Sequence, residues 1–137
     1  TLLATMKANR AYTALISGGF TAFTSHVAAE LGFHEHHANT LLIENGKLTG
    51  DVGRPILGQQ AKVDGLRRLA KLHGIEPSDA IAVGDGANDL AMLSDAGLGV
   101  ALHAKPHVQE SSLIRINHGD LTALLYLQGY RKEQFVD

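Results

Sequence analysis

Two carboxylates and an amide lie close together in the segment Gly84-Asp85-Gly86-Ala87-Asn88-Asp89, which follows the apolar run at residues 80–83. Asp85 comes directly after that run, and Asp89 follows four residues later, where a helical pattern begins. A hard cation such as Mg²⁺ binds a few carboxylate oxygens together with waters and phosphate oxygens. Gly86 permits a tight turn and a close approach of the backbone to a ligand. The segment therefore predicts a site for a metal ion and a phosphate.

Each part of this segment also has a plainer interpretation. Asp85-Gly86 alone would be an ordinary turn, and Asn88 or Asp89 alone would cap a helix. The complete hexapeptide after an apolar strand favours the ligand site over these alternatives.

Two further segments carry weaker signals for phosphate binding. Ser17-Gly18-Gly19 places a hydroxyl at a strand end, followed by glycines whose amides can face an anion; the alternative is a common glycine-rich turn. Lys62 stands at the start of a helical pattern and can place a point charge on a phosphate, or it is one surface lysine among several.

Buried strands are predicted to alternate with helices along the chain. The predicted strands are residues 12–17, 80–83, 98–102 and 113–116, and the predicted helices are 20–31, 59–73, one that passes through Leu90 and Leu93 up to Gly97, and one that Asp120 caps and that runs to 127. Asn45-Gly46 predicts a small β-hairpin between residues 40 and 52. This order predicts an α/β fold with a doubly wound, mostly parallel sheet, in which ligands bind beyond the carboxyl ends of the strands.

In the helix at 59–73, the residues Val63, Leu66, Leu69 and Leu72 form an apolar face. The basic residues, Lys62 among them, stay largely off that face. We therefore expect an amphipathic helix that packs on the sheet.

Composition narrows the functional classes. The 137 residues suit one domain, and a net charge of -2 gives no basic excess for nucleic-acid binding. The chain has no Cys, which fits a reducing compartment, and its apolar runs are shorter than the roughly 18 to 20 residues of a membrane span. We expect a cytoplasmic protein that binds neither nucleic acid nor membrane.

Two histidine-containing segments have open interpretations. The cluster His34-Glu35-His36-His37 has the residue types of a Zn²⁺ or Ni²⁺ site, but its spacing favours a solvated loop. His103 and Lys105 follow a predicted strand end and are either groups that orient the site or turn residues.

Five segments together resemble the phosphoserine phosphatases of the haloacid dehalogenase-like phosphatase superfamily. They are ALISGGFTAF, the Ala38-Asn39 pair, the Lys in GQQAKVDGL, VGDGANDLAML, and HAKP at residues 103–106. The order and spacing of the segments are similar to those of the family over nearly the whole chain. The resemblance implies a Rossmann-like sheet and Mg²⁺-dependent hydrolysis of L-phosphoserine to L-serine and phosphate, the last step of serine biosynthesis.

The resemblance also implies a role for each matching residue. Ser17 would bond a phosphoryl oxygen, with the backbone of Gly18 and Gly19 assisting at the substrate, and Lys62 would neutralise charge on the phosphoryl group. Asp85 would be a direct Mg²⁺ ligand, Asn88 a phosphate or substrate contact, and Asp89 a group that orients Lys62 or metal-bound water. Positioning and charge stabilisation of this kind are the main means of catalysing phosphoryl transfer.

The family's nucleophile lies in an Asp-x-Asp-x-(Thr or Val) motif, and no two Asp residues of this chain are separated by a single residue. The helical cap that would read the serine moiety, with its Glu and Arg, is also missing. We therefore expect residues 1–137 to be the C-terminal portion of a phosphatase core, without its first strand and cap, and inactive alone. The alternatives are a phosphatase for another small phosphate ester and a non-catalytic relative. The oligomeric state stays open, with a homodimer as one option.

Overall fold

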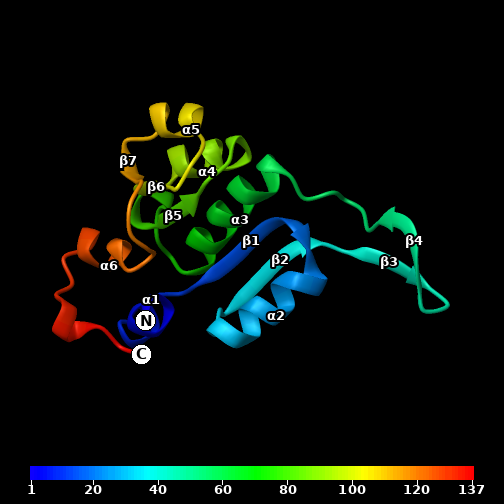
Figure 1. The fold of residues 1–137 in the computed structure, drawn as a ribbon, viewed down its shortest axis with the longest axis horizontal. Helices are drawn as coiled ribbons and strands as arrows, with labels where there is room; N and C mark the ends of the chain where they lie inside the picture. The colour runs from blue at the N-terminus through cyan, green and yellow to red at the C-terminus, as the bar shows by residue number, and fades with distance from the viewer. The chain divides into compact units, whose positions relative to one another are not determined.

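The computed structural model describes residues 1–137 and divides them into two units (Figure 1). The first unit contains residues 1–57 and 124–137, and the second contains residues 58–123.

The first unit holds a two-stranded parallel sheet and a hairpin. Its elements are α1 (Leu2–Ala8), β1 (Ala14–Phe20), α2 (Thr21–Leu31), β2 (Glu35–Asn39), β3 (Leu41–Glu44), β4 (Lys47–Val52), most of α6 (Ala123–Leu127) and a 3-10 turn at Lys132–Gln134. β1 pairs with β2 in parallel, and α2 packs on both strands. The antiparallel β3–β4 hairpin turns at Asn45 and Gly46, which both have positive φ, as a two-residue hairpin turn of the Asn-Gly type requires.

A bulge interrupts β1 at its carboxyl end. Ile16 pairs with His37 and Phe20 pairs with Asn39, so residues 17–19 lie opposite the single residue Ala38. Bulges of this kind often redirect the chain beside functional sites.

The histidine cluster corrects one expectation, because residues 35–39 form the strand β2 and not a solvated loop. His34 Nδ1 lies 2.9 Å from Thr13 Oγ1, and His36 Nδ1 lies 3.0 Å from Thr24 Oγ1. These histidines bond neighbouring side chains separately, and the structure forms no group of three or more metal-ligating side chains.

The second unit holds a three-stranded parallel sheet in the order β5-β6-β7. Its elements are α3 (Gln59–Leu72), a 3-10 turn at Pro77–Asp79, β5 (Ile81–Gly84), a 3-10 turn at Ala87–Asp89, α4 (Leu90–Asp95), β6 (Leu98–Leu102), α5 (Pro106–Glu110) and β7 (Ile114–Ile116). A core of small and branched side chains lies between α4, α5 and the sheet: Ala82, Leu93, Ala101, Ala104 and Val108.

An ion pair joins α3 to α4 in this unit. Arg67 donates to both carboxylate oxygens of Asp95, at 2.8 and 3.0 Å. These hydrogen bonds hold the pKa of Asp95 below its ordinary value.

The predicted α/β class with parallel strands is confirmed. The strand predicted at 12–17 is β1 at Ala14–Phe20, which continues through Gly18 and Gly19, and the short helix α5 was not predicted. None of the helices combines the length and apolar sequence that a membrane crossing needs.

The edges of both parallel sheets lead to a prediction about the isolated chain. β1 and β5 are edge strands, and parallel sheets are normally covered on both faces and flanked by further strands. Large apolar side chains are also exposed on α2 and the hairpin, namely Phe23, Leu31, Ile43 and Leu48. We expect isolated residues 1–137 to self-associate or to lack a cooperative transition. Sedimentation velocity at several concentrations and thermal melting measure this. A monomer with a sharp melting transition would contradict the expectation.

Candidate active site

Asp89 organises the loop that follows β5. Its Oδ2 accepts hydrogen bonds from the backbone N–H groups of Asp85, at 3.0 Å, and of Gly86, at 3.1 Å. Its Oδ1 accepts from Lys62 Nζ at 2.5 Å. Both oxygens of this carboxylate, which is only 3% exposed, are thus occupied by the protein.

Lys62 occupies a different position from the one that helix periodicity suggested. It lies on the buried face of α3 beside Val63 and Leu66, and only 8% of it is exposed. A buried ammonium group needs a charged partner, and Asp89 is the residue that supplies it. The expectation that Lys62 stays off the apolar face was therefore wrong, and the ion pair is the physical reason.

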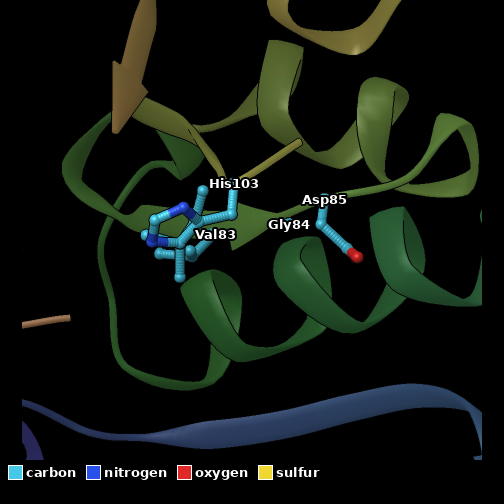
Figure 2. A pocket seen from close by; sticks show the side chains of 5 residues that line it. Val83, Gly84, Asp85 and His103 are labelled. Atoms are coloured by element: carbon cyan, nitrogen blue, oxygen red, sulfur yellow. The ribbon is translucent and has the colours of Figure 1, made fainter. Parts of the chain in front are cut away.

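Asp85 has the opposite environment. It is exposed at the end of β5, and its carboxylate makes no hydrogen bond or ion pair within the structure. An open pocket beside it is lined by Val83, Gly84, Asp85, Leu102 and His103. Figure 2 shows Asp85 and His103 in this pocket, at the ends of the neighbouring strands β5 and β6. Asp85 therefore has carboxylate oxygens free for an external ligand.

Two glycines allow the loop to close around Asp89. A Cβ atom at Gly84 would collide with the Asp89 side chain, and one at Gly86 would lie 2.7 Å from Asn88 Oδ1. Asn88 is exposed on the 3-10 turn and makes no side-chain hydrogen bond there. The sequence pattern predicted a requirement for glycine only at position 86, and the requirement at position 84 was not predicted.

The segment after β6 touches the same loop. His103 has a left-handed φ of 44°, and its ring Nε2 donates to the Gly119 carbonyl at 2.7 Å. Lys105 donates its backbone N–H to the Asp85 carbonyl at 3.3 Å. His103 lines the pocket and Lys105 is the N-cap residue of α5; a role of either side chain in orienting the site stays a prediction.

Ser17, Gly18 and Gly19 belong to the first unit and form the bulge of β1. Gly19 donates its N–H to Ser17 Oγ at 3.0 Å, and Asn39 Nδ2 donates to the Gly18 carbonyl at 3.0 Å. The structure thus brings Lys62, Asp85 and Asp89 into one site, while a shared role of Ser17 with them stays a prediction. Asn39 had no predicted role, although it lies in one of the five family-like segments.

Comparisons with known proteins agree on one family. The sequence matches the haloacid dehalogenase-like hydrolases over residues 1–94. It is 50% identical over 115 residues to the phosphoserine phosphatase of Haemophilus influenzae, which covers 84% of this chain and 37% of that protein. The fold is similar to a crystal structure of a probable phosphoserine phosphatase from Vibrio cholerae in unliganded form, with a TM-score of 0.89, 40% identity, and coverage of 93% of this chain and 40% of that one.

A substrate-bound phosphoserine phosphatase complex is also similar. Its TM-score is 0.86 at 39% identity, with 92% of this chain and 60% of that chain covered. The chain therefore spans only 37% to 60% of the lengths of these relatives.

The unequal hydrogen bonding of Lys62 and Asp89 generates a prediction about stability. Asp89→Ala leaves the buried ammonium of Lys62 and two backbone N–H groups without acceptors, so we expect a loss of about 3–5 kcal/mol in the free energy of unfolding. Lys62→Met leaves the carboxylate with its two backbone donors, and we expect a smaller loss of about 1–3 kcal/mol. Urea denaturation midpoints of the full-length polypeptide, at one fixed protein concentration, compare the variants.

Asp95→Ala is the control, because it breaks an exposed ion pair between α3 and α4 and should have only a slight effect. Equal losses for Asp89→Ala and Lys62→Met would show that Asp89 does not hold the loop together as described.

Proposed function

This chain belongs to the haloacid dehalogenase-like hydrolase family, and from that membership we propose that it forms the metal- and phosphate-binding part of a phosphoserine phosphatase. The proposed reaction is the hydrolysis of L-phosphoserine to L-serine and phosphate.

The contrast between Asp85 and Asp89 is the observation that supports this proposal most strongly. Asp89 is buried and uses both oxygens within the protein, whereas Asp85, four residues earlier, is exposed with unoccupied oxygens. A purely structural turn has no need for an unpaired carboxylate held in place by a second, buried one. The pair suits a ligand site that is rigid before the ligand arrives.

Mg²⁺ fits the residues present. Magnesium usually binds through one or two carboxylates, waters and substrate phosphate oxygens, and does not require a cage made only of protein. Asp85 is the proposed carboxylate ligand. When bound, the ion would neutralise negative charge on the phosphoryl oxygens.

The other residues are proposed to contact the phosphoryl group directly. Ser17 donates a hydroxyl hydrogen bond to a phosphoryl oxygen, with the backbone of Gly18 and Gly19 beside the substrate. Lys62, held by Asp89, supplies positive charge, and Asn88 supplies an amide contact. Charge and hydrogen-bond donors fixed in advance are what phosphoryl transfer needs.

The attacking carboxylate is proposed to come from an Asp-x-Asp motif outside residues 1–137. It forms a bond to phosphorus as the serine oxygen leaves and takes up a proton, and water then hydrolyses the aspartyl-phosphate. In the parent reading frame, we expect the motif about 70–100 residues upstream, enough for one βα unit and a small cap. We further propose a cytoplasmic enzyme that acts in serine biosynthesis; a homodimer is compatible with its exposed apolar surface.

The test uses the full-length polypeptide that contains these residues. We expect Mg²⁺-dependent release of phosphate from L-phosphoserine, and we expect Asp85→Ala to lower kcat/KM by at least about 100-fold, because the metal would lose its protein ligand. Residues 1–137 alone should release no phosphate.

Asp51→Ala is a matched control, since Asp51 is an exposed aspartate on the hairpin strand β4 and should leave activity unchanged. Wild-type activity in Asp85→Ala would refute the metal role. Faster hydrolysis of homoserine phosphate or of a sugar phosphate would instead assign the site to another small phosphate ester.

A further inference from the structure

Asn39 is a buried amide at the end of β2, and only 7% of it is exposed. Its Nδ2 donates to the Gly18 carbonyl at 3.0 Å and to the Leu57 carbonyl at 3.2 Å. Its Oδ1 accepts the Leu57 N–H at 2.7 Å. The amide therefore satisfies three backbone groups, all within the first unit.

One of these bonds acts on the bulge that carries Ser17. The Gly18–Gly19 peptide is trans, so its carbonyl and its N–H point in opposite directions. Asn39 holds the carbonyl, and the N–H on the other side donates to Ser17 Oγ at 3.0 Å. A single peptide plane thus links the buried amide to the serine hydroxyl.

This link determines what the hydroxyl can offer to a ligand. A serine hydroxyl has one O–H donor and two acceptor lone pairs, and the Gly19 N–H occupies one of the lone pairs. The O–H is left without an acceptor in the structure. A phosphate group carries acceptor oxygens, so a hydroxyl held in this state is ready to donate to it.

We propose that Asn39 is a positioning residue for phosphate binding, which fixes the Gly18–Gly19 peptide so that Ser17 presents its hydroxyl as a donor. This inference rests on the proposed function, in which Ser17 contacts the phosphoryl group. The side-chain chemistry supports it, since only an amide combines two donor hydrogens with an acceptor in one plane, as the Gly18 and Leu57 groups require.

A double-mutant cycle in the full-length polypeptide tests the link. Asn39→Asp keeps the acceptor for Leu57 but removes both donor hydrogens. We expect it to raise the dissociation constant of inorganic phosphate, measured by calorimetry with Mg²⁺ present, about tenfold, as the loss of one hydrogen bond to a charged group does. In the Ser17→Ala background the same substitution should change the constant about twofold or less.

Asn9→Asp is the matched control. Asn9 Nδ2 also donates to a backbone carbonyl of the first unit, that of Thr5, at 2.9 Å, but the bond lies at the end of α1. This variant should bind phosphate as the wild type does. If Asn39→Asp does not fold, Asn39→Ser removes the amide donors without adding a charge and takes its place in the cycle.

An equal weakening of phosphate binding in the Ser17 and Ser17→Ala backgrounds would overturn the inference, because Asn39 would then act only on overall structure. Unchanged binding in Asn39→Asp would overturn it as well. The binding measurement needs no turnover. A protein that binds phosphate but does not hydrolyse L-phosphoserine would therefore refute the proposed function, while the double-mutant cycle would still test the link between Asn39 and Ser17.

Discussion

The carboxylate of Asp89 is the group on which the loop after β5 depends. One of its oxygens accepts hydrogen bonds from the N–H groups of Asp85 and Gly86, and the other accepts from the ammonium of Lys62. The same contacts explain why position 84 requires glycine, since a Cβ atom there would collide with the Asp89 side chain. They also explain how a lysine can lie on the buried face of α3. Without Asp89, the ammonium of Lys62 on α3 and the backbone N–H groups of Asp85 and Gly86 would all lose their acceptor. The helix, the turn and the end of β5 would therefore be affected together.

In each unit, one buried polar side chain hydrogen-bonds several backbone groups, but the side chain is a carboxylate in one unit and an amide in the other. In the second unit the buried carboxylate of Asp89 accepts hydrogen bonds from three donors. In the first unit the buried amide of Asn39 donates to two carbonyls and accepts from one N–H. In both cases the side chain bonds backbone groups of an irregular segment, which is the loop after β5 for Asp89 and includes the bulge of β1 for Asn39. A turn whose backbone is not paired in a sheet needs such partners once it is taken out of water. The loop after β5 then carries the carboxylate of Asp85, and the bulge of β1 carries the hydroxyl of Ser17; each of these groups has unused hydrogen-bonding capacity.

Much of this arrangement could be predicted from the sequence, because hydrophobic runs and glycines report local structure directly. The strand at 98–102, the helix that begins at Gln59 and the Asn45-Gly46 hairpin all follow from such patterns. The burial of Lys62 did not, because periodicity assigns a charged residue to the polar side and cannot register a partner 27 positions away. The strand β2 was missed for a related reason. Its histidines look polar in sequence, but His36 bonds Thr24 of α2, and His34, just before the strand, bonds Thr13; only the fold brings these threonines near.

Two aspartates in one short segment thus have opposite environments, and the environment separates their chemistry. Asp89 is surrounded by donors from the protein, so it has no free oxygen with which to bind a ligand. Asp85 receives none of these donors, because its own N–H is turned toward Asp89 while its side chain leaves the loop beside the pocket. The orientation of the exposed carboxylate is therefore a consequence of the buried one. A loop of the same length that kept Asp85 but lacked the acceptor at position 89 would still contain the carboxylate that can bind a ligand. It would lack the hydrogen bonds that fix the backbone of residues 85 and 86 and so orient that carboxylate.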